Sequence, residues 1–138
     1  MNPKPAGYSG TPLAKKLGIG AGSRVYAKNA PSNYAQLIAP LPPGIKFEKR
    51  ITQDTDIAHV FADRRAALKV DLEVLRSSIR GNGVVWVSWP KKASLVPTDI
   101  TEDTIRELAL PLGLVDVKVC AVSDVWSGLK LVIRKELR

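Results

Sequence analysis

The side chains best suited to ligand chemistry lie where an apolar segment ends. Residues 83–89 form an apolar β-type run, and Pro90, Lys91 and Lys92 follow it directly. Because the run shows no alternation, it predicts a central strand with both faces covered. Its carboxyl end would carry Trp89, Lys91 and Lys92 to the edge where open α/β sheets usually bind ligands. An indole ring beside ammonium groups suits a flat, anionic molecule.

Other reactive side chains occur without the partners that catalysis requires. His59 is the only histidine, and it lies inside the apolar run Ile57–Phe61. With no nucleophile or carboxylate at motif spacing, this setting favours a hydrogen-bonded structural histidine over a catalytic base. Cys120 alternates with apolar residues, which favours a small apolar filler over a reactive thiol. One histidine and one cysteine also argue against a metal site.

The composition is that of a globular chain with excess positive charge. Hydrophobic residues make up 45% and charged residues 25% of the chain, which excludes general disorder. The net charge of +8 favours anionic partners, although the basic residues are scattered in pairs that also suit a solvated surface. No apolar run approaches the roughly 20 residues of a membrane helix, and the first residues lack the apolar centre of a secretory signal. We therefore expect a cytoplasmic protein without a membrane partner, in agreement with its single cysteine.

The pattern predicts one α/β domain over residues 11–138, preceded by a flexible arm at residues 1–10. Helices alternate with strands, which implies right-handed crossovers and a parallel sheet, whereas the last two strands are close enough to form an antiparallel hairpin. The expected strands are residues 24–28, 45–51, 57–61, 84–89, 115–121 and 126–134, and the expected helices are residues 13–17, 32–38, 63–79 and 99–112.

Polar residues at the predicted helix starts serve as expected caps. Ser32 and Asp63 would cap the helices that follow them, because short polar side chains accept bonds from free backbone N–H groups. Asp99 with Glu102 three residues later resembles a capping box for the last helix. These assignments account for the acidic residues without a catalytic role.

Three segments carry a resemblance to a known family: Tyr8-Ser9-Gly10-Thr11-Pro12-Leu13, Trp86-Val87-Ser88-Trp89-Pro90-Lys91 and Asp124-Val125-Trp126-Ser127-Gly128-Leu129-Lys130. Through them the chain resembles, over nearly its whole length, a family of small bacterial proteins catalogued as a domain of unknown function. The order of elements is similar to a shortened, degenerate form of the Rossmann-like fold of class I S-adenosylmethionine methyltransferases. The resemblance implies a mostly parallel six-stranded sheet flanked by helices and ending in an antiparallel hairpin.

The chain departs from the methyltransferase pattern where that family binds its cofactor. Those enzymes have a glycine-rich turn after the first strand and an acidic residue at the end of the second. Here Asn29-Ala30-Pro31-Ser32 follows the first strand, and Arg50-Ile51-Thr52 ends the expected second strand. We therefore expect no cofactor; S-adenosylmethionine is the alternative if the atypical loop still binds it.

The methyltransferase-like order also implies which residues share the carboxyl edge of the sheet. The last strand would lie antiparallel to the strand that contains Trp89, and the start of the last strand would reach the same carboxyl edge of the sheet, its rim. Trp89 and Trp126 would then either stack a flat ring or only cover the end of the core. The candidate ligand-binding residues at this rim are Lys28, Asn29, Asp63, Arg64, Trp89, Lys91, Lys92, Trp126 and Ser127.

Three functional hypotheses follow from these patterns. The leading one is a noncatalytic methyltransferase-like domain that binds an anionic small molecule or a protein partner at the carboxyl edge. The second is a methyltransferase with an atypical cofactor loop. The third is a basic RNA-associated protein, although the sequence contains no RNA-binding strand motif, zinc module or helix-turn-helix. The expected edge strands, residues 45–51 and 115–121, leave a homodimer open.

Overall fold

The structure, a computed structural model, describes residues 10–138. Apart from Gly10, the expected arm at residues 1–10 lies outside the described residues. One six-stranded sheet has the order β2-β1-β3-β4-β6-β5. The strands are β1 (Arg24–Lys28), β2 (Lys46–Glu48), β3 (Ile57–Phe61), β4 (Val84–Pro90), β5 (Leu114–Ala121) and β6 (Trp126–Ile133).

The strand directions confirm the expected α/β fold. β1 pairs in parallel with β2 and β3, and β3 pairs in parallel with β4. β6 lies antiparallel to both β4 and β5, so the chain ends in the expected antiparallel hairpin. All five residues of β3 are buried, as the absence of alternation in its sequence predicts for a strand covered on both faces.

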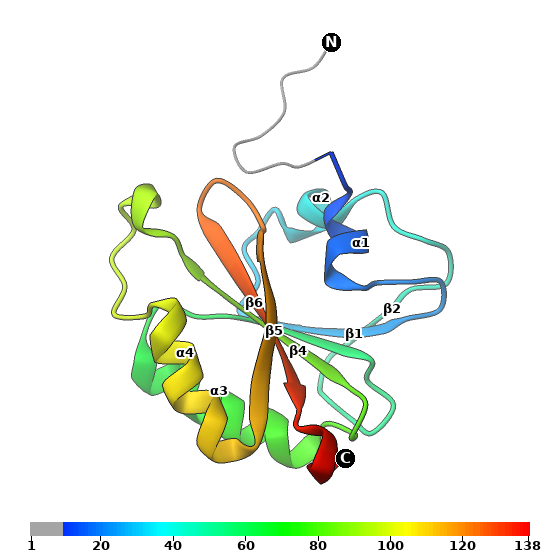
Figure 1. The fold of residues 1–138 in the computed structure, drawn as a ribbon. Coiled ribbons are helices and arrows are strands. Elements are labelled where there is room, and N and C mark those ends of the chain that lie inside the picture. The colour runs from blue at the N-terminus through cyan, green and yellow to red at the C-terminus, as the bar shows by residue number, and fades with distance from the viewer. Residues whose placement is uncertain (1–9) are drawn as a thin grey trace.

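Helices cover the two faces of the sheet in separate layers (Figure 1). The longer helices, α3 (Arg65–Ser78) and α4 (Glu102–Ala109), pack side by side on one face. Two five-residue helices, α1 (Leu13–Leu17) and α2 (Tyr34–Ile38), cover the other face. Three 3-10 turns complete the described elements: η1 (Lys92–Ser94), η2 (Leu110–Leu112) and η3 (Lys135–Leu137).

The short helices are held to the sheet by buried polar contacts as well as by packing. Trp86 of β4 donates its indole N–H to the carbonyl of Leu17 at 3.0 Å, which fixes the end of α1. The hydroxyl of Tyr34 in α2 lies 2.9 Å from Nδ1 of His59 in β3. Helices this short are marginal alone, so these tertiary contacts position the layer.

The helix caps differ from those expected. Asp63 does not cap α3; the backbone N–H of Arg65 donates instead to Oδ1 of Asp99 at 2.6 Å, from a loop 34 residues later. α4 has a capping box, but Thr101 and Thr104 form it, not Asp99 and Glu102. Asp99 is not the cap of α4 because the helix begins only at Glu102, with Thr101 as its N-cap, and the Asp99 carboxylate accepts the N–H of Arg65 instead.

Two further predictions were wrong: the start of one helix and the length of one strand. α2 begins at Tyr34, and its N-cap is Asn33 rather than Ser32, with no side-chain cap bond. β2 extends only over Lys46–Glu48 instead of residues 45–51. Among residues 10–138 it pairs only with β1, at the edge of the sheet, and the basic residues after it bend away into solvent.

Candidate functional site

The carboxyl edge of the sheet collects loops from distant parts of the sequence. β1, β3 and β4 all end there, and the register places Trp126 opposite Pro90, so the turn between β5 and β6 reaches the same edge. In Figure 1 this turn lies at the top of the molecule, and the C-terminal η3 lies at the opposite, amino edge. We call this carboxyl edge the rim, and the positions of the candidate residues are described relative to it.

Lys28, the last residue of β1, forms an ion pair with another residue of the domain. Its ammonium lies 2.6 Å from Oδ1 of Asp71 in α3, whose side chain is only 8% exposed. The hydrogen bond to Asp71 raises the pKa of Lys28, and partial burial opposes it. The positive charge of Lys28 is therefore matched internally, unlike that of the other basic candidates.

Asn29 gives the turn after β1 an unusual backbone. Its φ of 58° lies in the left-handed region, which glycine prefers and asparagine tolerates better than most residues. Its side-chain Nδ2 lies 3.4 Å from the carbonyl oxygen of Phe61, at the end of β3. The chain thus makes a tight turn at the end of β1 without the glycine of the methyltransferase pattern.

The end of β2 corrects one sequence inference. Because β2 stops early, its last residue is Glu48 and the second strand does end in an acidic residue. The carboxylate of Glu48 accepts hydrogen bonds from Arg24 Nε at 2.9 Å and from Thr55 Oγ1 at 2.8 Å, and its side chain is 12% exposed. Glu48 is thus engaged inside the fold and does not fit the role of holding a ribose.

Trp89 and Trp126 lie on opposite faces of the sheet. Trp89 belongs to the core beneath α3 and α4, whereas the ring of Trp126 packs edge-on against Phe61, 5.0 Å between centroids, on the face of α1 and α2. Trp89 pairs with Ser127 in the register, and a shift of one residue reverses the side of a side chain. The structure therefore does not bring the two rings together for stacking.

Three basic candidates at the rim have no ionic partner. Arg64, Lys91 and Lys92 make no ion pair with any side chain among residues 10–138. The carbonyl of Asp63 accepts a bond from Thr98 Oγ1 at 2.8 Å, which ties the loop before α3 to the loop after β4. The cations therefore belong to two loops that are joined at this edge.

A cavity of about 440 Å³, which Lys92 lines and Arg64 and Lys91 do not, lies at this edge, and we term it the rim cavity. Trp89 and Lys92 are the two sequence candidates that line it, and Glu102 of α4 contributes a carboxylate already paired with Arg106. Its volume is in the range of small-molecule sites. Its full lining is Trp89, Pro90, Lys92, Leu95, Val96, Pro97, Thr98, Ile100, Thr101 and Glu102.

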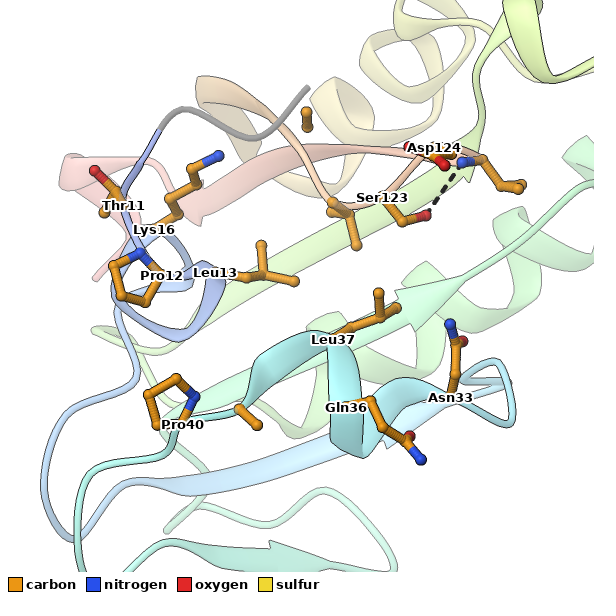
Figure 2. Close-up of a pocket in the computed structure, with 14 residues that line it drawn as sticks. Thr11, Pro12, Leu13, Lys16, Asn33, Gln36, Leu37, Pro40, Ser123 and Asp124 are labelled. Carbon is orange, nitrogen blue, oxygen red and sulfur yellow. Dashed lines mark hydrogen bonds between the residues drawn. The ribbon is translucent and has the colours of Figure 1, made fainter. Parts of the chain in front are cut away.

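A second cavity, of about 490 Å³, opens on the other face, and sequence reasoning missed it (Figure 2). It lies between α1, α2 and the turn between β5 and β6, and we term it the helix–hairpin cavity. No local motif marks it, because its walls come from three separate stretches of the chain. Its lining is Thr11, Pro12, Leu13, Lys16, Asn33, Gln36, Leu37, Ala39, Pro40, Ala121, Val122, Ser123, Asp124 and Val125.

His59 is a hydrogen-bonded histidine inside the core, as its sequence setting indicates. Its ring is fully buried, with Nδ1 2.9 Å from Tyr34 Oη and Nε2 2.7 Å from Ser88 Oγ. Burial lowers the pKa of His59 to about 3, so the ring is neutral at physiological pH. The His59 ring joins β3, β4 and α2 and has no access to solvent.

The remaining reactive group and the metal question add little to the site. Burial raises the pKa of the Cys120 thiol, so it is a poor nucleophile near neutral pH. Within residues 10–138, no group of three or more His, Cys, Asp or Glu side chains is arranged to hold a metal ion. No helix in the same range is long and apolar enough to cross a membrane.

Comparison with known proteins supports the fold. No family model and no curated protein matches the chain. Solved structures do, and one is a SAM dependent methyltransferase from Aquifex aeolicus, with a TM-score of 0.62, 9% identity and 88% of both chains covered. Another is N-methyltransferase NodS from Bradyrhizobium japonicum WM9, with a TM-score of 0.58, 11% identity and coverage of 89% of this chain and 92% of NodS.

A third similar structure is the tRNA methyltransferase TrmK from B. subtilis, with a TM-score of 0.60 and 11% identity. The match covers 88% of this chain but 63% of TrmK. At such identities the likeness establishes a Rossmann-like, methyltransferase-like fold and nothing finer. Membership of the bacterial family of unknown function stays a prediction.

Proposed function

We propose that this methyltransferase-like domain is a noncatalytic binding module that takes an anionic small molecule at the rim cavity. The observation that carries the proposal is the unpaired cation Lys92 in the wall of a cavity that Trp89 also lines, with Lys91 and Arg64 unpaired on the two loops that meet at this edge. A phosphate or carboxylate would satisfy these charges, and the apolar wall would contact the rest of the ligand.

The lining supports binding rather than catalysis. Its ionisable side chains are Lys92 and Glu102, and the carboxylate of Glu102 is held by Arg106. The only histidine is buried on the other face of β3, away from this cavity. The rim cavity therefore has charge to attract an anion but no nucleophile paired with a base.

The test compares thermal unfolding with ATP, inorganic pyrophosphate and adenosine at matched ionic strength. We expect the two anions to raise the midpoint and adenosine to have little effect; a ligand at one hundred times its Kd adds about 2.7 kcal/mol. Lys92→Ala should remove most of the rise. Lys135→Ala, the same charge change at the exposed C-terminal end of the chain, is the matched control.

Two outcomes would contradict this function. One is an equal rise with adenosine, which would show that the anionic group is not recognised. The other is an equal loss in Lys92→Ala and Lys135→Ala, which would assign the anion effect to the overall charge of +8. A rise that disappears steeply with salt in both variants would favour nonspecific polyanion binding.

A methyltransferase is the second candidate, favoured by the left-handed backbone at Asn29. This residue gives the turn after β1 the conformation that glycine supplies in the methyltransferase pattern. The engaged carboxylate of Glu48 does not support a ribose contact. Thermal unfolding with saturating S-adenosylhomocysteine in low salt tests this candidate: a rise of several degrees supports it, and an unchanged midpoint contradicts it.

A further inference from the structure

Hydrogen bonds anchor the walls of the helix–hairpin cavity. α1 is fixed by the bond from Trp86 to Leu17, and α2 by the contact between Tyr34 and His59. The Oγ of Ser123 accepts the backbone N–H groups of Val125 and Trp126, each at 3.2 Å, which closes the third wall. Each wall is therefore held in place by bonds that a ligand need not form, which reduces the cost of ordering on binding.

The base of the cavity is apolar. Leu13 of α1 and Leu37 of α2 point toward the same central space in Figure 2. Val122, in the turn between β5 and β6, also lines the cavity. Leu13 and Val122 are buried in the core of this face. The cavity thus offers a surface for an aliphatic or aromatic group of moderate size.

Opposite charges stand on two different walls. Lys16 of α1 lines one side, and Asp124 of the β5–β6 turn lines another. Neither forms an ion pair in the part of the chain that the structure describes.

We infer that this cavity is a second binding site, for a small apolar molecule that carries both a carboxylate and an ammonium group, such as a large apolar amino acid. The carboxylate would pair with Lys16, the ammonium with Asp124, and the apolar group would contact Leu13 and Leu37. A ligand with one charge would leave one of the two walls unmatched, so the zwitterion is preferred. This site goes beyond the anion site proposed at the rim cavity.

The experiment uses three probes with the same aromatic ring and different charged groups. L-Phenylalanine has both groups, 3-phenylpropionate lacks the ammonium and phenethylamine lacks the carboxylate. Dissociation constants are measured by isothermal titration calorimetry on the full chain and on the variants Lys16→Met and Asp124→Asn. Lys15→Met is the matched control, because Lys15 is an exposed neighbour in α1 that does not line the cavity.

The expected result is a crossed pattern. Lys16→Met should weaken L-phenylalanine and 3-phenylpropionate by about tenfold or more and leave phenethylamine unchanged, because one charge-assisted bond is removed. Asp124→Asn should weaken L-phenylalanine and phenethylamine by about the same factor and leave 3-phenylpropionate unchanged. Lys15→Met and Lys92→Ala should bind all three probes as the parent chain does.

Three results would overturn the inference: no binding of L-phenylalanine at millimolar concentrations, equal affinity for all three probes, or equal losses in Lys15→Met and Lys16→Met. The midpoint of thermal unfolding without ligand shows whether each variant is folded. Loss of anion binding in Lys92→Ala with unchanged L-phenylalanine binding keeps the two cavities separate, so either proposal can fail alone.

Discussion

The amino and carboxyl edges of the sheet use their basic residues in different ways. At the amino edge, Arg24, the first residue of β1, pairs at 2.8 Å with the carboxylate of Glu48, which reaches back from the end of β2. Arg80 pairs with Asp56, which also accepts the backbone N–H of Arg24 at 2.7 Å. At the carboxyl edge, Arg64 and Lys92 have no such partners among the described residues. Apart from Lys28, which Asp71 holds, the basic residues named at the carboxyl edge therefore remain available to a ligand, whereas those at the amino edge hold the fold together.

The backbone shows the same contrast. Among residues 10–138, the non-glycine residues with positive φ are Asn29, at 58°, and Leu95, at 62°. Both lie in loops at the carboxyl edge, after β1 and after β4. The side chain of Leu95 is also 88% exposed although it lines the rim cavity. Asn29 turns the chain at the end of β1, and Leu95 is the left-handed cap that ends η1, its N–H donating to the carbonyl of Lys92.

The largest effect is expected from breaking the amino-edge network. Asp56→Ala removes the acceptor of the Arg24 N–H and the partner of Arg80, so the free energy of unfolding should fall by about 2 kcal/mol. Asp124→Ala, at an exposed and unpaired carboxylate of the other edge, should change it by less than about 0.5 kcal/mol. Urea unfolding measures both, and equal losses would remove the contrast between the edges.

The amino edge should also make stability sensitive to acid. Burial raises the pKa of Asp56, but the bonds from Arg24 and Arg80 outweigh it and the net pKa is lowered. The Thr55 and Arg24 bonds likewise lower the pKa of Glu48. Groups with lowered pKa contribute stability above their unfolded values, 3.8 and 4.5, and this stability is lost as pH falls through the folded values.

Glu48→Gln therefore sharpens the comparison. The parent chain should lose stability to urea between about pH 5 and pH 3, and the difference between parent and Glu48→Gln should shrink over that range. Glu107→Gln, at an exposed carboxylate without an ion pair in the described chain, is the control and should give a difference that stays nearly constant. A constant difference for Glu48→Gln would show that its bonds are not favourable.

The overall fold could be predicted because its signals are local. The apolar run of β4 ends at two lysines, and its lack of alternation correctly placed it in the centre of the sheet. Burial on both faces explains why β3 showed the same pattern. The expected strand order is accordingly confirmed by the pairing of β4 with β6.

The details of the candidate sites could not be predicted, because they depend on contacts between distant residues. Whether Trp89 and Trp126 share a face depends on the register of β4 and β6. The register places Trp89 opposite Ser127, the residue next to Trp126, so the two tryptophans lie on opposite faces. The cap of α3 comes from Asp99, which no pattern near Arg65 reveals. The helix–hairpin cavity exists only when α1, α2 and the β5–β6 turn are assembled.

The strain at the carboxyl edge gives a smaller effect of opposite sign. Leu95→Gly should raise the free energy of unfolding by about 0.5 kcal/mol, because relief of a left-handed backbone, roughly 1–2 kcal/mol, exceeds the entropic cost of glycine. Little burial is lost, since the leucine side chain is 88% exposed. Urea unfolding of Leu95→Gly against Leu95→Ala isolates the backbone contribution, and a destabilised glycine variant would show that the leucine contacts hold the loop.

The smallest effect is expected from removing the unpaired cations themselves. Arg64→Ala and Lys92→Ala should each change the free energy of unfolding by less than about 0.5 kcal/mol, because neither side chain has an ionic partner to lose. Any change should be slightly stabilising in low salt and should vanish in high salt, since these cations repel one another across a chain of net charge +8. A loss above about 1 kcal/mol in either variant would show that the carboxyl edge uses these cations for stability as the amino edge does, and the distinction between a structural and a ligand-binding edge would fail.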